Sequence, residues 1–348
     1  MKEMESEIEK LIKVWVSAIL GLCYCYYIAS RIPKGFLRFF SLIPIIYLFI
    51  TLPFKISSPN LVGYTSFFLV WLGTFKLLLF SFNHGPLALS PPNILHFISI
   101  ASLPITPKQH PPPTKQNKPK WLLPLKALLF ATIARAYDYN QHLHPHFLLL
   151  LYCCHLYLGL EVIFAIVATP VQIISGFQIE SQFDEPCLST SLQDFWGHRW
   201  NLMVSRILRP SIYGPVRRMS TPFMGPFYAM LVAMFATFLV SGLMHELIYY
   251  YVIRVPPTWE ITCFFVLHGV CTVAEVAVKK VALRRGWRLH RVISGLLVVA
   301  FLSVTANWLF FPQLLRNGMD QKSSEEYAVL INFFKSRLPL LDVFNSPK

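Results

Sequence analysis

A histidine followed by a glutamate interrupts an otherwise apolar run over residues 235–251. His245 and Glu246 are the only imidazole, acidic or basic groups in this run. An ionisable group at the centre of a membrane helix costs about 2.5–3.5 kcal/mol, so such groups usually face a cavity or take part in chemistry. Imidazole is the side chain best suited to take up and release protons near neutral pH. His245 is therefore a candidate general base, and a packed histidine bonded to a neighbouring helix is the alternative interpretation.

A second unusual segment, residues 189–209, has the pattern of an amphipathic helix. Thr190 and Gln193 match a capping box at its start, and Pro210 is expected to end it. At about 100° per residue, one stripe is apolar and consists of Leu192, Trp196, Trp200, Met203 and Ile207. The opposite side is polar and carries Asp194, His198, Asn201 and Ser205. A helix lying on the membrane surface explains the stripe, but the concentration of Trp, Arg and Asn exceeds what adhesion requires.

Two arginines lie along one edge of the apolar stripe. The stems of Arg199 and Arg206 can cover apolar surface while their guanidinium groups reach phosphates. The phosphates of a lipid headgroup or of a polyphosphate-bearing ligand such as coenzyme A are the candidate partners.

Composition indicates that these segments belong to a membrane protein. The chain has 348 residues, of which 55% are hydrophobic and 14% charged, whereas a soluble domain has about 25% charged residues. A membrane-crossing helix needs about 20 apolar residues. We therefore predict one all-α, polytopic membrane domain over residues 1–348. About eight transmembrane helices are expected, at 11–29, 36–54, 61–82, 121–136, 147–170, 227–252, 258–278 and 292–311.

Basic residues gather in alternate loops of this arrangement. The stretches 31–38, 108–120, 199–218 and 279–291 are rich in Lys and Arg, whereas the intervening connections have only Lys55, Arg135 and Arg254. By the positive-inside rule, the basic loops should face the cytosol and both termini the other side, provided that 121–136 crosses. The Pro- and Lys-rich stretch 104–120 is predicted to be a flexible loop.

Several functional classes are disfavoured by the same data. The formal charge of +14 is divided among short loops that contact lipid headgroups, so no nucleic-acid partner is expected. The seven cysteines show no metal-ligand spacing. The histidines at 142, 144 and 146 flank a proline and are interpreted as loop residues. The inverted repeats typical of transporters are not visible.

Four stretches together resemble a known family. They are FKLLLF at 75–80, TSLQDFWGHRWNLMVS at 190–205, VSGLMHE at 240–246, and FVLHGVC at 265–271 with VKK at 278–280. The chain resembles plant wax synthases of the jojoba type, the long-chain-alcohol O-fatty-acyltransferase branch of the membrane-bound O-acyltransferase superfamily. Plant sterol acyltransferases and Euonymus-type diacylglycerol acetyltransferases share these motifs. The family usually has Arg where this chain has His198.

The resemblance implies acyl transfer from acyl-CoA to a lipophilic alcohol in the endoplasmic reticulum membrane, without metal or bound cofactor. The motif region spans about 180–270. His245 matches the superfamily histidine and would act as general base, and Asn201 matches the motif asparagine and would stabilise the oxyanion. Further substrate-binding candidates are Trp196, Arg199, Trp200 and Glu246.

The acceptor expected from this resemblance is a long-chain fatty alcohol, which would give a wax ester. A sterol or diacylglycerol acceptor is the alternative within the family. A transporter or a non-catalytic lipid-binding protein is the distant alternative outside it. Glu161, Glu275 and His268 also lie in apolar runs and are expected to make structural contacts.

Overall fold

The computed structural model describes residues 2–89, 93–107, 121–137, 143–176, 179–286 and 289–337. In these ranges the chain is helical, with one isolated β-bridge between Pro107 and Ile179. The first half contains α1 (Lys2–Tyr27), α2 (Phe36–Thr51), α3 (Pro59–Thr65), α4 (Thr74–Ser81), α5 (Ile94–Ser102), α6 (Leu122–Ala136) and α7 (Pro145–Ser175). The second half contains α8 (Leu192–Asp194), α9 (Leu202–Leu208), α10 (Gly214–Ile253), α11 (Glu260–Arg284), α12 (Arg291–Thr305), α13 (Pro312–Arg316) and α14 (Met319–Arg337).

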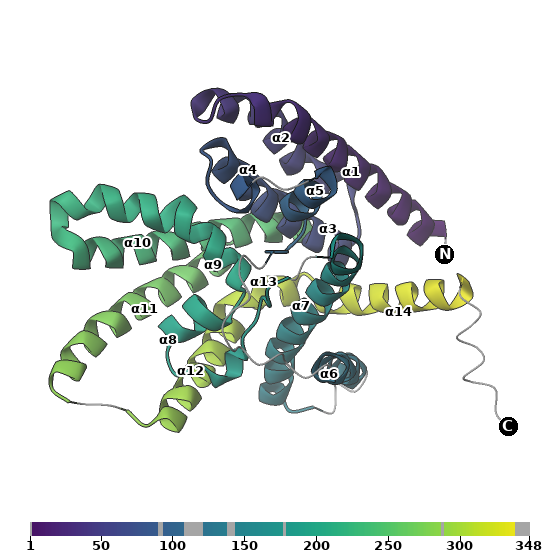
Figure 1. The fold of residues 1–348 in the computed structure, drawn as a ribbon. Coiled ribbons are helices and arrows are strands. Elements are labelled where there is room, and N and C mark those ends of the chain that lie inside the picture. The colour runs from purple at the N-terminus through teal and green to yellow at the C-terminus, as the bar shows by residue number, and fades with distance from the viewer. Residues whose placement is uncertain are drawn as a thin grey trace.

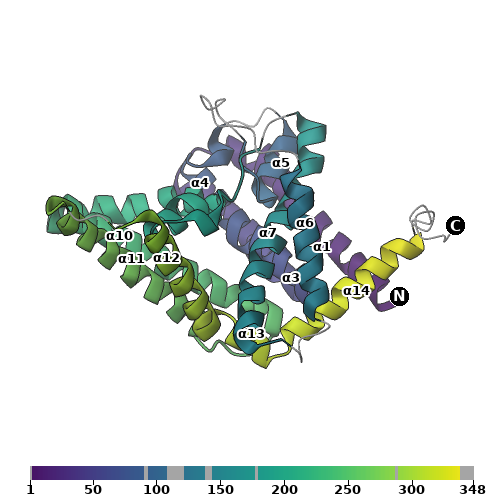
Figure 2. The same cartoon turned by 90° about the horizontal axis from the view of Figure 1, so that it is seen from below.

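Figure 1 shows α10, α11 and α12 grouped on one side of α7, with α1 and α14 reaching out on the other. Figure 2 shows the same division after a quarter turn. Between these groups, the π-helical turn Ser66–Gly73 joins α3 to α4 and is almost completely buried. This turn therefore places a buried, mostly apolar wall beside α10.

The prediction of a multi-pass, all-α membrane protein is confirmed. Within the described residues, seven helical segments are long and apolar enough to cross a membrane. They are Met4–Arg31, Phe36–Lys55, Pro59–Ser81, Phe147–Ile174, Leu202–Ile253, Glu260–Ala282 and Arg291–Arg316. Large apolar side chains on their outer faces are exposed, as expected for contact with lipid.

The eighth expected span, 121–136, is the exception. It forms α6, which has 15 residues and a length of about 22 Å at 1.5 Å per residue, less than the roughly 30 Å of a bilayer core. The helix packs along α7, where the Lys126 ammonium lies 2.9 Å from a Glu161 carboxylate oxygen. The count of eight is thus approximate, and the loop orientation derived from it stays a prediction. Most of the loop 104–120 lies outside the described residues.

A buried lysine holds α5, the short apolar helix before the loop 104–120, in place. The last carbonyls of α5 point at Lys76, whose side chain is fully buried. The Lys76 Nζ donates to the carbonyl oxygens of Ile100 at 2.7 Å and Leu103 at 2.6 Å. Because a cation at a helix C-terminus satisfies free carbonyl groups and the helix dipole, α5 can end inside the protein.

α10 consists of two arms that meet at Gly225. This residue has φ 76° and ψ 166°, a backbone conformation that only glycine adopts without strain. Figure 1 shows that the chain reverses there and that the second arm returns beside the first. The bend therefore brings the arm that carries His245 against the segment around α9.

Candidate active site

The segment 189–209 does not form the single helix that its pattern predicts. Ser191, not Thr190, is the N-cap, and its Oγ accepts from the Asp194 backbone N–H at 3.0 Å. After α8 comes the π-helical turn Phe195–Arg199, then extended backbone at Trp200 and a left-handed Asn201 with φ 40° and ψ 64°. Asn tolerates this conformation better than most residues. Because of this break, residues 192–208 form a bent segment instead of one straight helix. We call this bent segment the cup.

Pro210 does not end the segment either. It lies in the first turn of the π-helical stretch Arg209–Tyr213, which leads directly into α10. Proline has no N–H to donate to the preceding turn of α9, and the chain passes this point as a π-helical stretch with helical backbone on both sides. The motif region is consequently continuous with the helix that carries His245.

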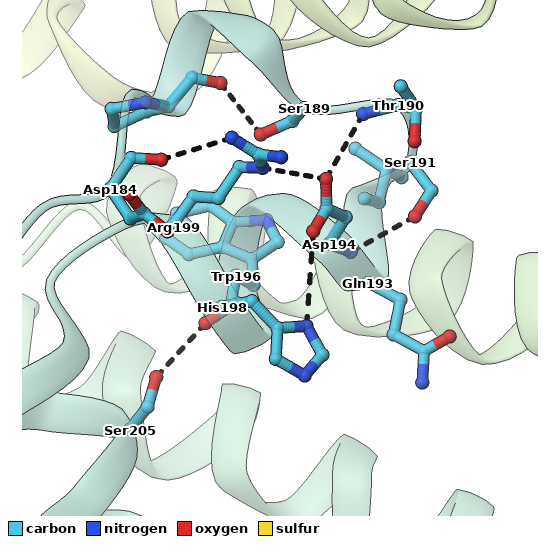
Figure 3. A network of polar contacts seen from close by, with 12 residues as sticks. Asp184, Ser189, Thr190, Ser191, Gln193, Asp194, Trp196, His198, Arg199 and Ser205 are labelled. Atoms are coloured by element: carbon cyan, nitrogen blue, oxygen red, sulfur yellow. Dashed lines mark hydrogen bonds and ion pairs between the residues drawn. The ribbon is translucent and has the colours of Figure 1, made fainter. Parts of the chain in front are cut away.

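Arg199 holds this cup together, as Figure 3 shows. Its Nε donates to the Asp194 carboxylate at 2.7 Å, and a terminal nitrogen donates to the backbone oxygens of Asp184 at 3.1 Å and Glu185 at 3.3 Å. Arg206 forms an ion pair with Glu180. Both arginines have a carboxylate partner within the protein, and neither lines the cavity described below. The geometry thus favours a structural role over the phosphate-binding role that the sequence predicts.

A cavity of about 530 Å³ opens between the cup, α10 and α11. The cup contributes Trp196, His198, Trp200, Asn201 and Ser205 to its wall. The second arm of α10 contributes Met234, Phe238, Ser241 and His245. The fold therefore brings the two candidate catalytic residues and both motif tryptophans to one cavity.

His245 is held in a defined orientation on this wall. Its Nδ1 lies 2.8 Å from the Ser241 backbone oxygen. Because a carbonyl oxygen only accepts, Nδ1 must carry the proton, which leaves Nε2 with a free lone pair. The ring stacks on Phe265 with centroids 4.2 Å apart and meets Trp71 edge-on at 4.7 Å. His245 thus has the tautomer and the rigidity that a general base requires.

Three polar atoms on the cavity wall have no hydrogen-bond partner in the part of the chain that the structure describes. They are the Trp71 Nε1, the Asn201 Oδ1 and the Thr272 Oγ1, all buried. Buried polar groups in native proteins are nearly always hydrogen-bonded. An amide can present either its oxygen or its NH₂ group by rotating about its last torsion. These atoms consequently indicate a ligand with both donor and acceptor groups.

Comparison with known proteins shows the family of the chain. Residues 179–267, which hold the cup and His245, match the model of the Membrane bound O-acyl transferase family. The chain is 45% identical to the probable long-chain-alcohol O-fatty-acyltransferase 1 of Arabidopsis thaliana, over 95% of this chain and 98% of the relative. It is 44% identical to the long-chain-alcohol O-fatty-acyltransferase of Simmondsia chinensis, over 97% and 98%.

The chain belongs to the long-chain-alcohol O-fatty-acyltransferase family.

In this acyltransferase, His268 has a second function beside the expected packing. It is fully buried, and its Nδ1 accepts from the Trp196 indole N–H at 3.2 Å while its Nε2 lies 2.9 Å from the Thr305 hydroxyl oxygen. The Thr305 hydroxyl donates to the Phe301 carbonyl at 2.7 Å. Every group in this chain of bonds is satisfied in a single tautomer, so His268 fixes the Trp196 ring on the cavity wall. No feature of the sequence indicates that Trp196 and His268 form a hydrogen bond.

Glu246 lies away from the cavity, contrary to its expected substrate contact. Its carboxylate accepts from the backbone N–H groups of Trp259 at 3.0 Å and Thr262 at 3.2 Å, and from the Thr262 hydroxyl at 2.9 Å. These are the free N–H groups at the start of α11. The acyltransferase therefore uses Glu246 to hold α11 against α10.

The two half-buried carboxylates in apolar runs, Glu161 and Glu275, make structural contacts, as predicted. Glu161 pairs with Lys126, and Glu275 accepts from the backbone N–H groups of Leu192 at 2.8 Å and Gln193 at 3.2 Å. Glu275 thus attaches the start of α8 to α11. Of the loop histidines, His142 lies outside the described residues. The described residues contain no group of three or more His, Cys, Asp or Glu side chains that could hold a metal ion.

Two other arginines line the cavity. The sequence placed them in a basic loop but gave no indication that they line a functional site. Arg209 and Arg217 are exposed cavity-lining residues. In the described part of the chain, neither forms an ion pair with a carboxylate, unlike Arg199 and Arg206. They give one end of the cavity a positive charge that is free to meet an anion.

Proposed function

We propose that this protein transfers a fatty acyl group from acyl-CoA to the hydroxyl of a long-chain primary alcohol and so makes a wax ester. The observation that carries the proposal is that one cavity joins His245, with its free Nε2 lone pair, to Asn201, whose amide oxygen has no partner among the described residues. The names of the relatives supply the substrate class, since both are long-chain-alcohol O-fatty-acyltransferases.

The chemistry follows from these two residues. The alcohol donates its hydrogen bond to the His245 Nε2, and the proton moves there as the hydroxyl oxygen attacks the thioester carbonyl carbon. The carbonyl oxygen becomes an oxyanion, to which the Asn201 amide donates, a contribution of about 2.7–4 kcal/mol when well aligned. The C–S bond then breaks, and the sulfur leaves as CoA thiol with the proton from His245.

Arg209 and Arg217 are the residues that we assign to the CoA phosphates. Guanidinium groups bind phosphate through paired, charge-assisted hydrogen bonds. Since both arginines line the same cavity as His245, the phosphates would sit at the charged end and the thioester farther in. This assignment replaces Arg199 and Arg206, whose guanidinium groups are already bound to protein carboxylates.

The setting is proposed to be the endoplasmic reticulum membrane, where the lipid substrates dissolve. We further propose that the reaction uses no bound metal or cofactor, because a thioester is itself an activated acyl donor.

The decisive experiment is an acceptor panel. The purified protein is given labelled palmitoyl-CoA with hexadecanol, a sterol or diacylglycerol, and in a second series palmitoyl-CoA competes with acetyl-CoA. Hexadecyl palmitate should be the main product. Preferential acetylation of diacylglycerol would refute the wax-ester assignment and leave the roles of His245 and Asn201 standing.

A further inference from the structure

A second cavity, of about 290 Å³, lies farther along α10 than the first. Its wall is built by α3, α6, α7, α13, α14 and the last turns of α10. Aromatic and aliphatic side chains cover most of it, among them Tyr64, Leu156, Leu160, Tyr249, Phe311 and Tyr327. No step proposed above uses this space.

Two unsatisfied polar atoms belong to neighbouring rings in this apolar wall. The Tyr137 hydroxyl and the His155 Nδ1 are buried and have no hydrogen-bond partner among the described residues, and their rings have centroids 5.4 Å apart. Burial raises the pKa of Tyr137 above its usual range, so its hydroxyl stays protonated and able to donate. An occupant that carries one hydroxyl group, which both donates and accepts, would satisfy this pair.

The charge of the wall excludes the acyl donor as that occupant. Among the described residues, the lining contains no arginine or lysine, and its one carboxylate, Asp320, accepts from the Tyr152 hydroxyl at 3.2 Å. A phosphate-bearing ligand would find no cation here, in contrast to the first cavity with Arg209 and Arg217. The occupant must therefore be neutral as well as apolar.

The Phe310 ring lies close both to His245 in the first cavity and to Tyr249 in the second. Tyr249 lies one helical turn after His245 and donates from its hydroxyl to the Phe310 backbone oxygen at 2.8 Å. The Phe310 ring has its centroid 6.1 Å from that of His245 and 5.8 Å from that of Tyr249. Phe310 ends the π-helical turn Ala306–Phe310, an irregularity often found at functional sites.

We propose that the second cavity binds the neutral, single-hydroxyl lipid acceptor, with its hydroxyl between Tyr137 and His155, before it passes Phe310 to reach His245. This inference rests on the proposed function, because it takes the long-chain alcohol as acceptor. It assigns the two substrates to different cavities, the anionic thioester to the charged one and the alcohol to the uncharged one.

Photolabelling tests the site without turnover. Hexadecanol bearing a diazirine on its chain is irradiated with the inactive His245→Ala full-length protein, and the labelled peptides are sequenced. Labels should fall on α6, α7 and α13, and Tyr137→Phe should lower their yield at subsaturating probe by about two- to tenfold, the equivalent of one hydrogen bond. Tyr47→Phe, the same change on the lipid-exposed face of α2, is the matched control and should have no effect.

Kinetics supply the second measurement, in otherwise unmodified protein. Tyr137→Phe should raise KM for hexadecanol by the same factor and leave KM for palmitoyl-CoA and kcat unchanged. Labels confined to the first cavity, or an equal loss in Tyr47→Phe, would overturn the proposal. If the unmodified protein does not esterify hexadecanol, the proposed function is refuted. In that case the photolabelling pattern alone tests whether the second cavity binds the alcohol.

Discussion

Replacing His245 by alanine is the sharpest test of the mechanism, because the structure separates its chemical effect from its structural effect. The ring makes one hydrogen bond, to the Ser241 carbonyl, and within a helix that oxygen keeps its backbone partner four residues on. The substitution leaves no polar atom unsatisfied, so the lost bond costs about 0.5–1.5 kcal/mol of stability. Removal of a general base, by contrast, lowers the rate by about 10²–10⁴-fold.

The assay compares kcat, KM and thermal stability of the purified variant with those of His84→Ala. His84 is a matched control, since its Nδ1 also lies near a main-chain oxygen, that of Phe82 at 2.7 Å, and its side chain is exposed away from the cavity. We expect a fall in kcat of at least about 100-fold for His245→Ala, with KM for acyl-CoA unchanged, and no change for His84→Ala. Activity within tenfold of the unmodified enzyme at normal abundance would show that His245 is not the base.

Three further substitutions test the rest of the site. Asn201→Ala should lower kcat by about 10²–10³-fold with little change in KM for either substrate, whereas a pure KM effect would assign Asn201 to ground-state binding. Arg217→Ala should raise KM for acyl-CoA by about tenfold, and this effect should weaken at high salt. The control is Arg218→Ala, at an adjacent residue that does not line the cavity, and it should leave KM for acyl-CoA unchanged. Equal effects of the two substitutions would contradict the assignment of Arg217 to the CoA phosphates. A Cβ at Gly269 would lie 2.9 Å from the Cβ of Phe238, so Gly269→Ala should separate α10 from α11 and cost about 1–3 kcal/mol, measured as a lower melting temperature; an unchanged melting temperature would mean that the helices adjust freely.

Local patterns in the sequence were sufficient to predict the helical membrane architecture. Long apolar runs form most of the expected spans because backbone groups in lipid must be satisfied within a helix. The stripe positions Met203 and Ile207 are buried as expected. α6 departs from its prediction because its length, not its composition, decides whether it crosses. The helical period also failed between Arg199 and Asn201, where tertiary hydrogen bonds to Arg199 stabilise a broken backbone that local propensity does not favour.

The class of chemistry can be inferred from the sequence alone, because an ionisable His245 in an apolar helix and the motif around Asn201 are visible without a structure. The partner of each charged group, by contrast, follows from the three-dimensional packing of the helices. Arg206 and Glu246 are bound by groups that are distant in the sequence, and Arg199 is bound by a nearby carboxylate and two backbone oxygens. Arg209 and Arg217, by contrast, line the cavity. Which charged groups pair depends on how the helices pack, and the spacing of residues in the sequence does not encode this packing. A charged side chain can bind substrate only where the fold leaves it without a protein partner.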